Sequence, residues 1–312
     1  MMPAAMFQAS THSAKAQAVL AVCVYALLPI LAPSPGSAQS PPANDCVLVS
    51  GDARTVVRIV DAETIGLDDG REVRLVGALA PRPPLSASAD ENWPPETEAV
   101  DALRRLLSGK TVELAVVGRR ADRYGRTLAQ AFVIDGNERT WVQGRMLSEG
   151  HGRAYALPES VACLEALVAR EKSAREARRG LWASAAYAVR QAGRPGELMR
   201  LRSTFQIVEG TVETAADVKG SIYLNFGADW HSDFTAGVAH SVLASQFRGT
   251  DQPALLKGRK VRVRGWIERR NGPFIEIIHP GQIEVLDASS AVAEGRAGNE
   301  KRPNPVEGPG VP

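Results

Sequence analysis

Short strand-like segments, separated by turns rich in Gly and Asp, constrain the fold of this chain more than any other feature. They fall into two blocks, and helical spacing interrupts each block only briefly. In the first block the expected strands are 47–49, 55–61, 65–67, 72–76, 111–117 and 127–134, and the expected helices are 96–107, 142–149 and 160–181. This order predicts strands that curl around a helix and finish with a C-terminal helix.

The second block repeats the strand-rich pattern with one helix between its third and fourth strands. Its expected strands are 205–212, 221–226, 234–238, 260–268 and 274–278, and its expected helix is 241–247. Five short strands with an intervening helix are typical of small barrels of the OB type. The fold class predicted is therefore mainly β with helices (α+β), with one five-stranded OB-type barrel followed by a second OB-like barrel.

A length of 312 residues also favours two domains. We expect domains at 45–183 and 203–287, a linker at 184–202 and a disordered, Gly/Pro-rich tail at 288–312. An apolar run at 16–32 followed by Gly36-Ser37-Ala38 predicts a signal peptide at 1–38 that is cleaved after Ala38. The protein is then periplasmic or secreted, with no stable membrane insertion, and the alternative is an uncleaved membrane anchor.

Removal of the signal leaves two cysteines, Cys46 and Cys163. Two cysteines in an exported chain predict one disulfide, and the alternative is a pair of unpaired buried thiols. The formal net charge is only +2, so bulk attraction to nucleic acid is weak. Anion binding therefore has to come from local clusters of basic residues.

Five segments, in order, carry a family resemblance over Thr55 to Trp182. They are VRIVDAET, EVRLVGALAPR, DRYGRTLA, GHGRAYALPE and AREARRGLW. Together they resemble the staphylococcal nuclease (thermonuclease) family. The resemblance implies an OB-type barrel that hydrolyses phosphodiesters with two arginines, calcium-binding carboxylates and a glutamate that activates water.

Arg74 and Arg126 match the two catalytic arginines of that family. Negative charge grows on the equatorial oxygens of a phosphodiester in the transition state. A guanidinium is planar, permanently charged and able to donate two hydrogen bonds to such oxygens. The resemblance therefore implies a phosphate grip by both arginines, and the alternative for Arg74 is an ordinary ion pair with Glu72 or Asp69.

The calcium and base positions of the resemblance are mostly changed. Glu63 stands at the first carboxylate position, Leu79 at the second, and Ala80 offers only its carbonyl. One carboxylate and one carbonyl make a poor calcium cage, so we expect weak calcium binding at Glu63 or none. Arg82 stands where the family has the general base, and arginine cannot accept a proton near neutral pH.

A displaced carboxylate in or after the same Pro-rich loop is the alternative base. The candidates are Asp90, Glu91, Glu96 and Glu98, which otherwise are solvated charges of the loop and helix start.

Further substrate contacts are predicted at Tyr124, Tyr155, Arg262 and Arg264. Tyr124 lies in the turn that presents Arg126, where it and Asp122 have a structural role, and Tyr155 either binds the ligand or packs with its hydroxyl at the surface. In the second barrel, alternation predicts one basic face with Arg262 and Arg264. The aromatic residues that would stack bases, or otherwise form the core, are Tyr223, Phe226, Trp230, Phe234 and Trp266.

Three hypotheses of function follow. The first is an exported protein of nuclease descent that binds single-stranded nucleic acid or another phosphate-bearing ligand, with impaired or no hydrolysis. The second is an active phosphodiesterase with a displaced loop carboxylate. The third is a non-catalytic envelope scaffold that binds a protein partner.

Overall fold

The computed structural model describes residues 48, 51–84, 92–158, 163–247 and 252–286. The predicted signal peptide, its cleavage site, the strand at 47–49 except for Leu48, and the tail at 288–312 lie outside these residues. Cys163 is disulfide-bonded, but Cys46 also lies outside them, so the pairing of these two cysteines stays a prediction. Within the described ranges no helix is long and apolar enough to span a membrane.

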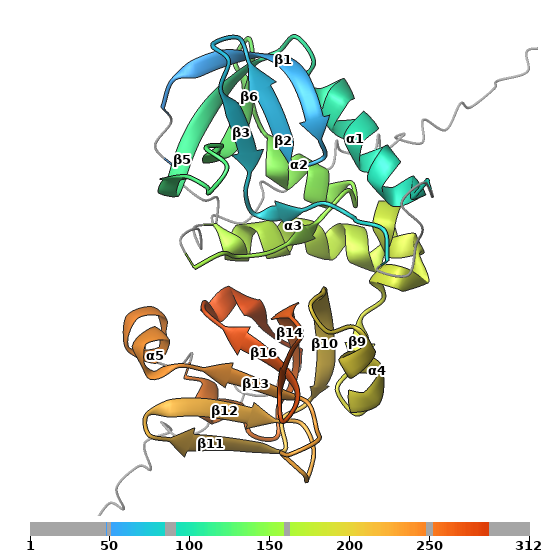
Figure 1. The fold of residues 1–312 in the computed structure, drawn as a ribbon, viewed down its shortest axis with the longest axis vertical. Helices are drawn as coiled ribbons and strands as arrows, with labels where there is room; N and C mark the ends of the chain where they lie inside the picture. Colours follow the sequence, from blue (N-terminus) through green and yellow to red (C-terminus); the bar gives the residue numbers. More distant parts are fainter. Residues whose placement is uncertain (1–47, 49–50, 85–91, 159–162, 248–251, 287–312) are drawn as a thin grey trace, which may run out of the picture. The chain divides into compact units, whose positions relative to one another are not determined.

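The first sheet closes on itself and confirms the predicted five-stranded barrel (Figure 1). Its strands follow the order β3-β2-β1-β5-β6-β7, and β3 also pairs in parallel with β6. The closed ring is therefore β1, β2, β3, β6 and β5, and β7 extends it. The bounds are β1 Ala53–Asp61, β2 Thr64–Leu67, β3 Glu72–Leu75, β5 Thr111–Ala121, β6 Thr127–Asp135 and β7 Glu138–Trp141.

Three helices accompany this barrel: α1 Pro94–Leu107, α2 Val142–Ser148 and α3 Leu164–Glu176. The face of α1 that carries Ala99, Leu103 and Leu107 is fully buried in the barrel core. The predicted helix 160–181 ends earlier than expected. Arg178 and Gly180 both have positive φ, which takes the chain out of the helix before a 3₁₀ turn, η1 Gly180–Ala183.

A short pair of strands fixes the loop that follows β3. β4 (Ala78–Leu79) pairs antiparallel with β8 (Arg153–Ala154). The backbone N–H of Tyr155 then donates to the carbonyl of Gly77 at 3.1 Å. The segment after β3 is thus held against the segment after α2, which brings Tyr155 to the site.

The second half of the described chain contains two sheets around one core. One has the order β17-β14-β10-β9 and the other β11-β12-β13-β16-β15. The bounds are β9 Arg190–Gln191, β10 Phe205–Thr211, β11 Thr214–Val218, β12 Ser221–Asn225, β13 Thr235–Val238, β14 Lys260–Trp266, β15 Glu268–Arg270, β16 Gly272–Ile277 and β17 Ile283–Val285, with α4 Pro195–Arg200, α5 His240–Gln246 and the 3₁₀ turns η2 Ala185–Tyr187, η4 Pro253–Leu256 and η5 Pro280–Gln282. This is loosely consistent with the predicted second OB-like barrel.

The range 184–202, predicted as a linker, contains short regular elements. These are η2, β9 and α4, and β9 pairs in parallel with β10. The segment therefore adds an edge strand to the sheet that contains β10 and β14. Its Leu198 is fully buried in the core of the second half, because an apolar side chain on α4 faces that core.

Candidate functional site

Arg74 and Arg126 come together because β3 and β6 are neighbours in the first barrel. The parallel pairing places Arg74 opposite Leu128, two residues beyond Arg126. On its other side, Arg74 pairs with Thr64 of β2, and Arg126 donates from an Nη to the Thr64 hydroxyl at 3.2 Å. The side chains of Arg74 and Arg126 are 27% and 20% exposed, so both are mostly buried but still reach solvent.

Asp122 fixes the turn that presents Arg126. One carboxylate oxygen accepts from the backbone N–H groups of Tyr124 (2.9 Å) and Arg126 (3.0 Å), and the other accepts from Nε of Arg126 at 2.8 Å. Burial raises the pKa of Asp122, but these hydrogen bonds outweigh it and hold the pKa below its usual range. Tyr124 itself is 68% exposed, with the Arg126 guanidinium 5.3 Å from its ring centre.

Glu63 is the buried carboxylate beside Arg74. One oxygen accepts the Ala80 N–H at 2.6 Å, and the other lies 3.3 Å from an Nη of Arg74. Burial raises the pKa of Glu63 in spite of both contacts. The alternative partners predicted for Arg74 are engaged elsewhere: Glu72 with Arg58, and Asp69 with Arg54 and Arg71.

The side chains around Glu63 do not fit a calcium ion, which needs several oxygen ligands that are free to bind it. Glu63 has both oxygens in contact with N–H donors, and Leu79 has no side-chain oxygen. Asp61 accepts the Glu63 N–H at 2.7 Å, and its second oxygen lies 3.7 Å from Arg82. Across the described ranges no cluster of three His, Cys, Asp or Glu residues forms a metal site.

Arg82, directly after Pro81, extends toward acidic residues of the barrel. Its guanidinium bonds Glu96 in the first turn of α1 at 3.0 Å. The backbone carbonyl of Arg82 accepts from the Tyr187 hydroxyl at 3.0 Å. Glu96, one of the candidate displaced bases, is thus paired with a guanidinium, while Asp90 and Glu91 lie outside the described residues.

Two buried donors at the site make no hydrogen bond within the described part of the chain. They are Nε of Arg74 and the hydroxyl of Tyr155. Arg74 lies close enough to the Tyr155 hydroxyl to lower its pKa through its charge and a hydrogen-bonding interaction, but the geometry is too poor for either buried donor to count as paired. Burial raises the Tyr155 pKa to about 12, so the hydroxyl keeps its proton. Tyr155 is only 2% exposed and packs edge-on against Trp266, so the alternative of a surface hydroxyl is wrong.

The second-barrel arginines have a different environment from the open basic face that was predicted. The alternation itself is confirmed, because Val261 and Val263 are fully buried in the core. Arg264, however, is only 2% exposed, and its two Nη atoms lie 2.9 and 3.2 Å from the Glu171 carboxylate of α3. Arg262 contacts Glu209 at 2.7 Å and Glu284 at 3.3 Å.

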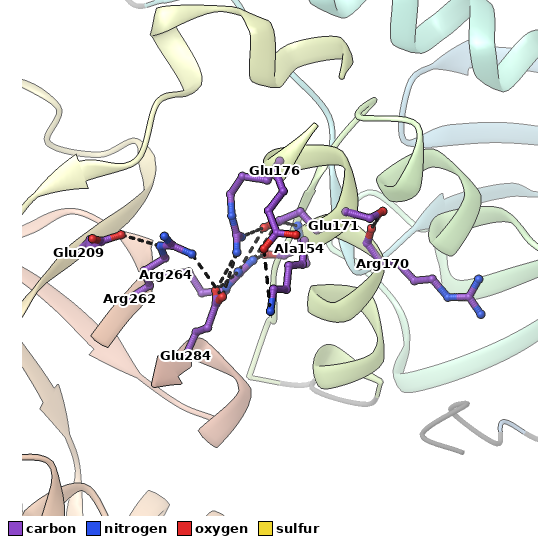
Figure 2. A network of polar contacts seen from close by, with 11 residues as sticks. Ala154, Arg170, Glu171, Glu176, Glu209, Arg262, Arg264 and Glu284 are labelled. Atoms are coloured by element: carbon purple, nitrogen blue, oxygen red, sulfur yellow. Dashed lines mark hydrogen bonds and ion pairs between the residues drawn. The ribbon is translucent and has the colours of Figure 1, made fainter. Parts of the chain in front are cut away.

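Figure 2 shows these charges converging in one network, with Glu171 and Glu284 facing Arg264. Arg175 joins it through Glu284 at 2.9 Å, and the Ala154 N–H donates to Glu171 at 2.7 Å. Arg264 therefore has no open donor face for a ligand. The helix that covers this face lies about ninety residues earlier in the chain, so local alternation gives no signal for it.

The aromatic residues of the second barrel divide into core and surface. Phe226 and Phe234 are buried and pack against each other. Trp230 is 54% exposed and lines a groove of about 470 Å³ with Tyr223 and Phe274. The interpretation as core residues therefore holds for the two phenylalanines, and a stacking role for Trp230 stays a prediction.

Comparison with known proteins finds a family that is similar to most of the first barrel and the helices after it. Residues 72–184 match the model of the family described as staphylococcal nuclease homologue. The chain is 28% identical over 135 residues to the thermonuclease of Staphylococcus hyicus, which covers 41% of this chain and 75% of the relative. It is 32% identical over 134 residues to an uncharacterised protein of Bacillus anthracis, which covers 41% of this chain and 59% of that protein.

Proposed function

Because this chain carries a staphylococcal-nuclease-like domain, we propose that it binds a phosphodiester through Arg74 and Arg126 and hydrolyses it slowly or not at all. The ligand class is single-stranded nucleic acid or another phosphate-bearing molecule. The protein acts after export, in the periplasm or outside the cell, as its N-terminal sequence predicts.

The observation that carries the phosphate grip is the set of donors gathered around β2, β3 and β6. Arg126 is held in place by Asp122, and Arg74 and Tyr155 each have a buried donor without an acceptor in the described residues. Buried donors are nearly always paired in folded proteins. An anionic oxygen supplies the acceptor that both donors lack, and pairing there favours binding of a phosphate.

Impaired hydrolysis rests on the chemistry of three side chains. Arg82 stands where the resemblance requires a general base, and a guanidinium does not take a proton from water. Glu96, one of the candidate replacement bases, is paired with Arg82. Leu79 supplies no oxygen, so the second carboxylate position of the resemblance is not filled. Together these features favour a binding protein over an active phosphodiesterase.

The direct test measures cleavage and binding with the purified protein. Single-stranded DNA and RNA are incubated with calcium or with EDTA, and binding is measured at several salt concentrations. We expect salt-sensitive binding without metal-dependent cleavage. Cleavage that needs calcium or another metal supports the active-phosphodiesterase hypothesis, and no binding with no cleavage supports the scaffold hypothesis.

The binding site is tested with Arg126→Ala. Loss of a charge-assisted contact is expected to weaken binding of single-stranded DNA by about 10- to 100-fold. The matched control is Arg58→Ala in the same barrel, where the side chain is 63% exposed and pairs with Glu72. Equal losses in the two variants argue for diffuse charge attraction instead of a site.

The impairment is tested by restoring the family residues. Leu79→Asp combined with Arg82→Glu is expected to create calcium-dependent cleavage on the order of 10² above the background of the natural protein, since a general base alone contributes about that much. Leu79→Asp alone is the control, because it adds a metal ligand without a base. If the double variant gains nothing, the loss of activity extends beyond these two positions.

A further inference from the structure

A cleft of about 600 Å³ adjoins the loop after β4 and reaches the second half of the chain. Its basic lining residues are Arg82, Arg153, Arg190 and Arg200. No Asp or Glu is among its described lining residues, and aromatic rings of Tyr187, Phe205 and Trp266 complete the wall. Neither Arg74 nor Arg126 lines this cleft, which adjoins the site described above through Leu79, Ala80 and Arg82.

Arg153 is the most unusual charge in the cleft, because it is buried without an ion pair among the described residues. It is 9% exposed, and one Nη donates to the backbone carbonyl of Phe205 at 2.6 Å. Its Nε has no acceptor in the described part of the chain. Burial lowers its pKa to about 10, which still leaves it charged at neutral pH. A buried charge is costly unless an opposite charge compensates it.

Two further arginines of the cleft are also uncompensated within the described chain. Arg190 donates only to neutral acceptors, the carbonyl of Ala186 at 2.7 Å and the side-chain oxygen of Gln206 at 3.3 Å. Arg200, at the end of α4, is exposed and forms no ion pair with a described residue. Arg82 differs, because Glu96 partly neutralises it. The cleft therefore concentrates positive charge that the described residues only partly balance.

We propose that this cleft is a second phosphate-binding site, in which Arg153, Arg190 and Arg200 hold a phosphate group. Several guanidiniums around one pocket suit a tetrahedral, multiply charged anion, because each presents N–H donors in a planar fork. The phosphate belongs either to a free small molecule or to a nucleic-acid strand. The site does not include Arg74 or Arg126. An experiment that disproves phosphate binding here therefore leaves the function proposed above untouched, and the reverse also holds.

The first arm of the test uses inorganic pyrophosphate and isothermal titration calorimetry on the whole protein. Arg200→Ala is expected to weaken binding about tenfold, and Arg200→Glu to weaken it further, because each removes a donor that faces the anion. Arg202→Ala is the matched control, an exposed arginine two residues along that does not line the cleft. Arg126→Ala is expected to leave the part of pyrophosphate binding that depends on Arg200 unchanged, which separates this site from the first.

The second arm replaces pyrophosphate with a single-stranded oligonucleotide that has or lacks a 5′-phosphate. If the phosphate comes from nucleic acid, the oligonucleotide displaces pyrophosphate, and Arg200→Ala weakens its binding about tenfold. If the source is a small molecule, the oligonucleotide does not displace pyrophosphate. Both results support the site and identify its ligand.

Intrinsic fluorescence provides a readout that does not depend on Arg200. Trp266 lines the cleft and Trp230 does not. Pyrophosphate is expected to change the emission of the natural protein and of Trp230→Phe, but not of Trp266→Phe. The proposal is overturned if pyrophosphate does not bind, if Arg200→Ala and Arg202→Ala behave alike, or if only Arg126→Ala weakens binding.

Discussion

Two sets of strand arginines in this protein have opposite environments. In the first barrel, Arg74 is 27% exposed and has a buried Nε without a hydrogen bond in the described chain, and its neighbour Arg126 is 20% exposed and bonded to Asp122 and Thr64. Arg262 and Arg264 on β14 are bound to carboxylates from other elements, and Arg264 is almost fully buried. The residue type and the strand context are the same. What differs is whether another part of the chain supplies enough acceptors, and this decides whether an arginine is available to a ligand.

Arg262 and Arg264, called the closed set here because carboxylates of the protein bind them, are expected to give the largest effect. Removing one of their carboxylate partners should lower the free energy of unfolding. Glu171→Gln leaves the Arg264 guanidinium buried without its carboxylate, and breaking a buried pair in this way typically costs about 3–5 kcal/mol. The free energy of unfolding, from urea denaturation followed by circular dichroism, measures it. A loss below about 1 kcal/mol would mean that Arg264 finds another carboxylate, and Glu284 at 3.9 Å is the candidate.

The control for this variant lies on the same helix. Glu176→Gln removes an identical charge whose side chain is 61% exposed and whose partner, Lys172, is 3.9 Å away. Exposed pairs of this kind contribute about 0–0.5 kcal/mol, so its unfolding curve should nearly coincide with that of the natural protein.

Arg74 and Arg126, with Tyr155 beside them, form the open set. Variants of this set are expected to lose ligand binding without losing stability. Tyr155→Phe removes a buried hydroxyl that has no hydrogen bond in the described chain, so unfolding free energy should stay the same or rise by up to about 1 kcal/mol. Binding of single-stranded DNA should weaken about fivefold if the hydroxyl donates to the ligand. Calorimetric binding and thermal unfolding on the same sample measure both.

Tyr187→Phe is the matched control. The Tyr187 hydroxyl accepts from Trp93 at 2.9 Å and donates to the carbonyl of Arg82 at 3.0 Å. Its removal should cost about 1 kcal/mol of stability, because it leaves two partners unpaired. If Tyr155→Phe destabilises the protein as much as this control, the Tyr155 hydroxyl has a structural partner and the open set is not open.

Local pattern in the sequence predicts most of the longer elements of this fold, although β7 and β11 were not predicted. The alternation that put Arg262 and Arg264 on one face agrees with the burial of Val261 and Val263 on the other. The helix predicted at 96–107 corresponds to α1, whose Ala99 and Leu103 are buried. The signals that predict them repeat every two residues in a strand and every three or four in a helix. The short strands β4 and β8 were not predicted, because a pair of two-residue strands has no period to detect.

The partners of charged residues were much harder to predict than the elements. Glu63 meets Arg74 because β2 and β3 form a hairpin, yet the sequence equally allowed Glu72 or Asp69. Arg264 meets Glu171 across ninety-three residues, and the sequence gives no signal for such a contact. The prediction that Arg262 and Arg264 lie on the same face of the strand was therefore right, but the prediction that this face is open was wrong. Exposure depends on what the tertiary fold packs against the strand and not on the strand itself.

The smallest expected effect concerns Glu63, the carboxylate beside the open set, and its dependence on pH. Burial raises the pKa of Glu63 above 4.5, so the folded state holds this proton more tightly than the unfolded state does. Its contribution to stability is therefore fully present below pH 4.5 and is lost as pH rises through the folded-state pKa. Glu63→Gln cannot titrate and removes this dependence.

The measurement compares the unfolding free energies of the natural protein and Glu63→Gln between neutral pH and pH 4.5. We expect the natural protein to gain on the variant as pH falls across this window. Glu72→Gln, an exposed carboxylate paired with Arg58, is the control for simple loss of charge. If the natural protein instead gains on Glu63→Gln as pH rises, attraction to Arg74 outweighs the burial of Glu63. Arg74 would then be satisfied by its own protein as Arg264 is, and the contrast between the two arginine sets would fail.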